Sequence, residues 1–153
     1  MDKGDLFEKA PVQNSILTHA CNARGVWGRG IAVGFKQSYP QAFKKYNDAC
    51  RNKLAIPGKA FIAEDPKGLV GCLITSNHYN PPDPMLTVMH QTKSAVIDFL
   101  KQVKENYPGH EIHSNLFNSG LFEVPWEVTK NALQEAMVEA EYNGVWKVWA
   151  YHP

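Results

Sequence analysis

The most informative stretch of the chain reads His19-Ala20-Cys21-Asn22-Ala23-Arg24-Gly25-Val26-Trp27-Gly28-Arg29-Gly30-Ile31-Ala32. An apolar and β-branched run, which begins at Ser15 and is typical of a buried strand, leads into it. From Ile31 the apolar residues take helical spacing. The glycines at 25, 28 and 30 thus separate a strand from a helix, where glycine permits a sharp turn and the close approach of a ligand.

Backbone amides at the start of such a helix, together with the helix dipole, are suited to phosphate. The glycine order G-x-x-G-x-G is not a Walker A loop, which would need a GK[ST] ending, and it differs from the dinucleotide order G-x-G-x-x-G. A plain tight turn between strand and helix explains the glycines equally well. The stretch alone leaves both interpretations open.

The rest of the chain continues the alternation of strands and helices. Tyr39-Pro40 should end the first helix, and Pro40 can begin a second one. We predict the further strands over residues 60–63, 69–75, 112–117 and 145–151, with a long helix carrying Thr92 to Tyr107 and a last helix running from Pro125 to Asn143-Gly144. This order indicates one α/β domain over residues 1–153, with a largely parallel sheet covered by helices on both faces.

A second loop, Asn118-Ser119-Gly120-Leu121-Phe122-Glu123-Val124-Pro125-Trp126, also connects a strand to a helix through small residues. In sheets of this kind, ligands bind outside the carboxyl ends of the strands. Two such loops at one sheet edge would form a two-sided cradle for an anion.

Composition limits the partners. The 153 residues are 44% hydrophobic and 20% charged with a net charge of +1, and no basic stripe is present, so polymeric nucleic acid is not expected as a ligand. The three cysteines are dispersed, which favours a reducing compartment. The apolar run over residues 69–74 is too short to cross a bilayer, and no signal peptide is visible. We therefore expect an intracellular protein, cytoplasmic or nuclear, with no membrane partner.

His19 is the candidate catalytic residue, because it ends the first strand beside the proposed cradle and a histidine can exchange protons near neutral pH. It could serve as general acid, general base or nucleophile. The alternative is a buried histidine that is hydrogen-bonded to the backbone. The other histidines lack the spacing of a zinc site, so we expect no metal.

Three motifs, Gly4-Asp5-Leu6, the loop from Asn22 to Ala32, and Asn118 to Phe122, resemble in order and spacing the binding motifs of macro domains. The resemblance implies a three-layer α/β/α sandwich with a mixed, largely parallel sheet that binds ADP-ribose. It also implies roles for individual residues. The adenine would meet Asp5 and Leu6, with Trp149 or Tyr151 beside it, and the distal ribose would meet Asn22 and Phe122. The phosphates would lie on the amides of Gly28, Arg29, Gly30, Ile31 and Ala32 and on the loop formed by Asn118, Ser119, Gly120, Leu121 and Phe122.

Within the family, both loops are most similar to the yeast-type ADP-ribose 1″-phosphate phosphatases, which share the pattern His19-x-Cys21-Asn22 and the ending Val124-Pro125-Trp126. This likeness implies hydrolysis of ADP-ribose 1″-phosphate, a by-product of tRNA splicing, to ADP-ribose and phosphate, with His19 in catalysis and no cofactor. Glu123 is a second catalytic candidate that has no counterpart in those enzymes, and it could simply be an acid favoured at a helix start.

Other functions stay open at this point. The chain could be a binding module for free or protein-linked ADP-ribose, or a hydrolase of O-acetyl-ADP-ribose or of ADP-ribosylated protein. Macro domains that release ADP-ribose from glutamate use a lysine after the third strand and an aspartate in the second loop, whereas Asn77 and Phe122 occupy these regions here. A nicotinamide oxidoreductase fits less well, because the glycine order differs and the expected acid is missing.

Overall fold

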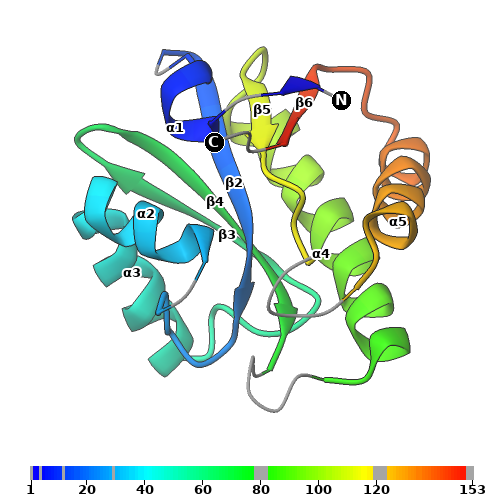
Figure 1. The fold of residues 1–153 in the computed structure, drawn as a ribbon, viewed down its shortest axis with the longest axis horizontal. Helices are drawn as coiled ribbons and strands as arrows, with labels where there is room; N and C mark the ends of the chain where they lie inside the picture. Colours follow the sequence, from blue (N-terminus) through cyan, green and yellow to red (C-terminus); the bar gives the residue numbers. More distant parts are fainter. Residues whose placement is uncertain are drawn as a thin grey trace.

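A computed structural model of the protein describes residues 2–3, 5–11, 13–28, 30–77, 83–118 and 124–150. The strands are β1 (Asp2–Lys3), β2 (Ser15–Asn22), β3 (Ala60–Asp65), β4 (Gly68–Ser76), β5 (Glu111–Ser114) and β6 (Trp146–Ala150). The helices are α1 (Leu6–Lys9), α2 (Ile31–Ser38), α3 (Pro40–Arg51), α4 (Met85–Asn106) and α5 (Trp126–Glu139). Figure 1 shows their arrangement.

The six strands form one sheet in the order β1-β6-β5-β2-β4-β3. β2 lies at its centre and pairs in parallel with β4, where His19 faces Cys72, and with β5, where Leu17 faces His113. Among the described strands only β3 runs antiparallel to its neighbour, and a tight turn joins it to β4. The predicted mixed, largely parallel sheet is therefore confirmed.

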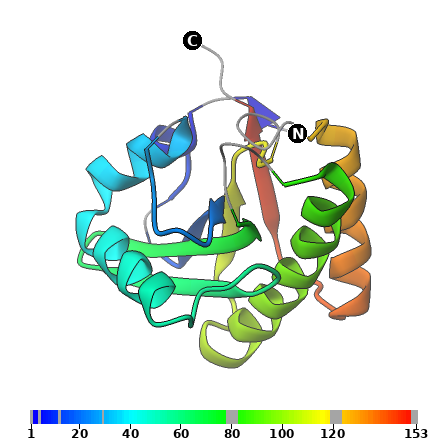
Figure 2. The same cartoon turned by 90° about the horizontal axis from the view of Figure 1, so that it is seen from below.

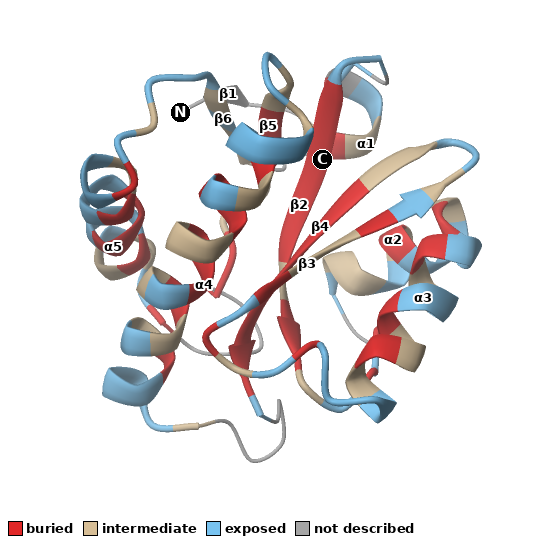
Figure 3. Ribbon diagram, turned by 180° about the vertical axis from the view of Figure 1, so that it is seen from behind, coloured by how far each residue is buried: buried red, intermediate tan, exposed pale blue. Residues whose placement is uncertain are grey.

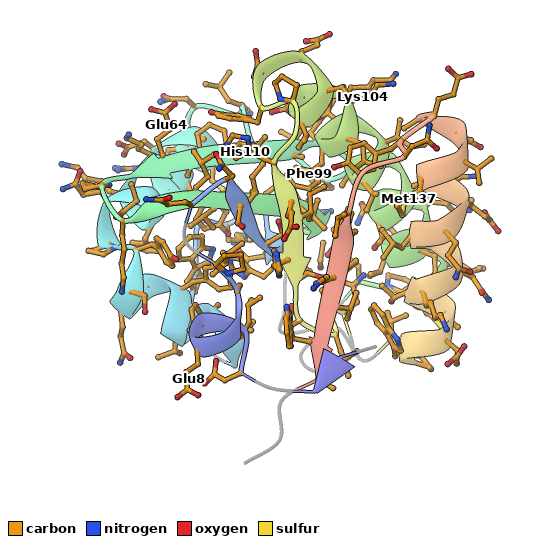
Figure 4. All side chains as sticks on the ribbon, turned by 90° about the horizontal axis from the view of Figure 1, so that it is seen from above. Glu8, Glu64, Phe99, Lys104, His110 and Met137 are labelled. Carbon is orange, nitrogen blue, oxygen red and sulfur yellow. The ribbon has the colours of Figure 1, made fainter. Side chains whose placement is uncertain are left out.

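Helices cover both faces of the sheet, as the view from below shows (Figure 2). One hydrophobic cluster contains Phe35 of α2 and Tyr46 of α3, and the other contains Phe99 of α4 and Leu133 of α5. The buried positions lie on the strands and on the inward sides of the helices (Figure 3). In Figure 4, Phe99 lies between α4 and the sheet, whereas Glu8 points outward from α1. The α/β/α sandwich is confirmed.

Proline places the break between α2 and α3 where the sequence predicts it. α2 ends at Ser38, and α3 has Pro40 as its first residue. The amide of Pro40 carries no hydrogen, so this position cannot continue the hydrogen-bond ladder of α2 but suits the first turn of a new helix.

Several elements differ from the prediction. The strand expected over residues 112–117 is β5, which ends at Ser114, because the chain turns away toward the second loop. The last helix ends at Glu139 rather than at Asn143-Gly144, since the Glu141 backbone adopts a φ of 52°. β1 and α1 were not predicted at all. Among the described residues no helix is both long and apolar enough to span a bilayer.

Candidate functional site

A cavity of about 540 Å³ opens beyond the carboxyl end of β5. Its lining comes from four separate segments: Asp5, Leu6 and Phe7 of the α1 region; Gly30, Ile31 and Gly34 around the start of α2; Asn115 and Leu116 after β5; and Trp149 of β6. Its volume lies in the range of small-molecule sites. Two other hollows, of about 450 and 300 Å³, contain no predicted site residue. The cavity thus unites the Asp5 motif with the first glycine loop.

Gly30 is the residue at which the backbone turns into α2. Its φ of 60° and ψ of −142° lie in a region that only glycine adopts readily, and it is the N-cap of the helix. A Cβ atom built on Gly30 would meet no atom within 4 Å, so the position is open toward the cavity. Ile31 and Ala32 follow as the first two residues of α2. Their position at the helix start makes the amides of this turn available to an anion.

Asp5 is the N-cap of α1. One of its carboxylate oxygens accepts a hydrogen bond from the Phe7 amide at 2.9 Å, and the side chain borders the cavity. The Phe7 ring packs edge-on against Phe35 and lies so close to Gly34 that a Cβ atom there would come within 2.7 Å of it. Gly34 therefore lets α1 and α2 approach each other, and this contact holds Asp5 beside the glycine loop.

Asn22 makes hydrogen bonds within the first loop. Its Oδ1 accepts from the amides of Arg24 and Val26 at 2.9 and 3.3 Å, and its Nδ2 donates to the Val26 carbonyl at 2.8 Å. The hydroxyl of Tyr46 also donates to the Asn22 carbonyl. The side chain is buried and shapes the first loop from within. Its predicted contact with the distal ribose finds no support in this arrangement and stays a prediction.

Asn118 anchors the second loop in the same manner. Its Oδ1 accepts from the Thr75 hydroxyl at 2.9 Å, and its Nδ2 donates to the Thr92 hydroxyl at 2.7 Å, so the side chain ties the loop to β4 and α4. The Val124 amide donates to the Asn118 carbonyl at 2.8 Å and closes the loop at its base. The loop itself, with the predicted residues Ser119, Gly120, Leu121, Phe122 and Glu123, lies outside the described residues, as do Arg29 and Tyr151.

His19 lies in the core. Its side chain is 0% exposed, its ring stacks on Phe35 with centroids 4.0 Å apart, and Trp27 covers it edge-on at 4.8 Å. It does not line the cavity. The burial agrees with the alternative that the sequence left open, but the contact of the ring nitrogens is with the Cys21 sulfur and not with the expected backbone group.

His19, Cys21 and Cys72 also form the one cluster among the described residues whose ligand atoms lie close enough for a metal, within 4.8 Å of one another. The Cys21 sulfur lies 3.4 Å from Nε2 of His19. Burial raises the pKa of the Cys21 thiol well above its ordinary value. Without a metal ion Cys21 is therefore a protonated thiol at neutral pH, and the expectation of no metal stays a prediction.

The structure adds four residues to the site. Phe7, Gly34, Asn115 and Leu116 line the cavity although the sequence analysis did not select them. The Oδ1 atom of Asn115 is buried without a hydrogen-bond partner. Asn115 directly follows β5. The strand was predicted to run on to residue 117, so the one available signal was a polar residue inside that expected strand.

Comparison with known proteins gives the family. The chain matches the Macro domain model over residues 18–133 and therefore belongs to the macro domain family. The solved macrodomain of Mycobacterium tuberculosis DarG has the same fold, with a TM-score of 0.78 and 23% identity over 100% of this chain and 98% of that chain.

Two relatives are similar over most of their length. An ADP-ribose 1″-phosphate phosphatase of Candida albicans is 36% identical over 143 residues, which cover 87% of this chain and 90% of the relative. An ADP-ribose 1″-phosphate phosphatase of Neosartorya fischeri is 33% identical, covering 90% of this chain and 89% of the relative.

Proposed function

We propose that this macro domain hydrolyses ADP-ribose 1″-phosphate to ADP-ribose and inorganic phosphate. The observation that carries the proposal is the 540 Å³ cavity, whose lining includes both the acidic N-cap Asp5 and the start of α2 with its free amides. This pairing suits a ligand with an exocyclic amino group at one end and a diphosphate in the middle. The relatives named as phosphatases of this substrate match the chain along most of its length.

In this proposal the Asp5 carboxylate accepts from the adenine amino group, with the Leu6 amide beside it. The turn from Gly28 to Ala32 binds the diphosphate, and the loop from Asn118 to Phe122 binds the terminal phosphate. Water attacks phosphorus, the bond from phosphorus to the sugar oxygen breaks, and that oxygen takes up a proton. Positioning and charge stabilisation by backbone amides supply most of what such a transfer needs.

The proton donor is His19 or Glu123. Glu123 belongs to the second loop, next to the proposed position of the terminal phosphate. His19 can act only if its ring leaves the stack with Phe35, so its burial favours a packing role. The same burial is the observation that favours a second function, a binding module for free or protein-linked ADP-ribose without turnover. In either case the partner is an ADP-ribose derivative, and the compartment that we propose is intracellular.

The test measures phosphate release from ADP-ribose 1″-phosphate and, separately, the dissociation constant for ADP-ribose. The wild-type protein should do both. Binding without phosphate release would establish the binding module. A third assay uses ADP-ribosylated protein as the substrate, and release of ADP-ribose from it would establish a hydrolase of ADP-ribosylated protein instead.

Two matched variants assign the proton donor. Glu123→Gln should lower turnover by about 10²–10⁴, the range for a positioned proton-transfer group, whereas Glu127→Gln, an exposed acid in the first turn of α5, is the control. His19→Phe keeps an aromatic ring on Phe35 but removes both nitrogens. Wild-type turnover in this variant would leave His19 with packing alone, and a comparable loss with intact ADP-ribose binding would place it on the chemical step.

A further inference from the structure

A chain of hydrogen bonds runs from the protein surface to the wall of the cavity. The Nε1 atom of Trp149, on β6, lies 3.0 Å from Nδ1 of His113, on β5. The Nε2 atom of His113 lies 3.0 Å from a carboxylate oxygen of Glu111 on the same strand. His113 is 1% exposed, whereas Glu111 reaches solvent at 43%. Trp149 borders the cavity.

The chemistry of the three groups determines where the protons lie. An indole nitrogen can only donate, so Nδ1 of His113 must be the acceptor and must carry no proton. The proton of the neutral imidazole then lies on Nε2, which donates to Glu111. The two ring planes are nearly parallel, at 12°, with centroids 6.2 Å apart, so the indole N–H points toward the in-plane lone pair of Nδ1.

Among the described residues, His113 is the acceptor that the Trp149 indole N–H contacts, and the side chains at the paired positions beside His113 offer no replacement. Leu17 of β2 and Lys147 of β6 occupy the paired positions on either side of His113. Leu17 is buried and apolar, and Lys147 can only donate. If this acceptor is removed, the half-buried Trp149 indole should rotate, because an unpaired N–H in such a position is costly in free energy.

We propose that His113 is a positioning residue for ligand binding: it fixes the Trp149 indole as a wall of the cavity, and Glu111 holds the proton that leaves Nδ1 free to accept. The inference rests on the proposed function, since the ligand that this wall serves is ADP-ribose. His113 itself does not border the cavity among the described residues, so it acts through Trp149.

The test compares His113→Leu with His113→Asn. The Asn side chain carries an oxygen near the place of Nδ1 and can still accept from the indole, whereas Leu cannot. The first measurement is the ¹H–¹⁵N resonance of the Trp149 indole, identified by its loss in Trp149→Phe. Its chemical shift should move in the Leu variant and stay close to the wild-type value in the Asn variant. An unmoved resonance in the Leu variant would refute the hydrogen bond.

The second measurement is calorimetric binding of ADP-ribose. We expect His113→Leu to weaken binding about tenfold, the size of one lost hydrogen bond, and His113→Asn to stay within about threefold of the wild type. In phosphate release the loss should fall on KM and leave kcat largely intact. Equal weakening by Leu and Asn would show that His113 only fills space.

A double variant tests the route through Trp149. Trp149→Phe should weaken binding by a similar factor, and adding His113→Leu to it should cost little more, because the two residues act as one unit. Additive losses would overturn the proposal. If the wild type failed to bind ADP-ribose, the proposed function would fall, while the indole resonance would still decide whether His113 positions Trp149.

Discussion

The anchoring of the second loop by Asn118 gives the sharpest stability prediction. The variant Asn118→Ala removes the acceptor of the Thr75 hydroxyl, a buried donor that has no other partner among the described contacts. An unpaired buried hydroxyl costs about 1–3 kcal/mol. The cost at Thr92 is smaller, because the Thr92 hydroxyl still donates a hydrogen bond to the Val88 carbonyl at 2.6 Å.

A second cost comes from the backbone. Asn118 has a φ of 67°, a conformation that costs an ordinary L-residue about 1–2 kcal/mol. Asn118→Ala should therefore lower the free energy of unfolding by about 2–5 kcal/mol in total, since both costs apply. Asn118→Gly also loses the side-chain bonds but accepts the positive φ, so it should be more stable than the alanine variant by about 1 kcal/mol.

Urea unfolding followed by circular dichroism measures both variants, and a Thr75→Val background provides the control. Valine has no donor to leave unpaired. In this background, Asn118→Ala should therefore lower the free energy of unfolding by about 1 kcal/mol less than it does in the wild type. The reasoning is refuted if Asn118→Ala is within 0.5 kcal/mol of the wild type, about the size of an ordinary surface effect. It also fails if the Thr75→Val background makes no difference.

Three further predictions concern the cavity and the thiols. Asp5→Ala should weaken ADP-ribose binding by about 1–3 kcal/mol and leave the binding of ribose 5-phosphate, which lacks adenine, unchanged. Asp5→Asn is the control, because its side chain can still cap α1. Equal weakening of both ligands would show that Asp5 does not contact adenine. Gly30→Ala should destabilise the protein by about 1–3 kcal/mol through the φ of 60° alone, because the added Cβ atom meets no other atom. The same variant should bind ADP-ribose more weakly in calorimetry. A melting temperature equal to that of the wild type would contradict this prediction. Burial raises the pKa of Cys21 above the ordinary 9.0, so above pH 9 the unfolded chain loses its proton while the native chain keeps it, and stability falls. The stability advantage of the wild type over Cys21→Ala should thus shrink by about 1 kcal/mol per pH unit above pH 9 in urea titrations, and a constant difference would argue against the raised pKa.

The elements that the sequence predicts well are those with a strong local signal. β2 is a continuous apolar and β-branched run, and Pro40 separates two helices by its covalent structure. β1 and α1 have two and four residues, too few to show periodicity. β1 exists because Asp2 pairs with Trp149, a partner from the far end of the sequence. Such a strand depends on tertiary contact, which no local pattern reveals.

The site shows the same limit in another form. The sequence indicates that Asn22 and Asn118 belong to ligand-binding loops, and the structure does place both at loop bases. Residue type alone does not say whether an amide faces a ligand or its own backbone, because both uses need the same donors and acceptors. The burial of His19 follows from the stack of aromatic rings contributed by α2 and the first loop, which is again a tertiary property.

The pairing of β1 with β6 has a consequence for the order of folding (Figure 1). During synthesis, β2, β3 and β4 can associate while the ribosome still has to make β6. The cavity, however, needs Asp5 from the beginning and Trp149 from the last strand, so it can form only after β6 has been released. Closing so long a loop is entropically costly, and a ligand that bridges both segments would repay part of that cost. An immobilised ADP-ribose analogue should therefore retain only finished molecules and let chains truncated before β6 pass, even where their central strands are already folded.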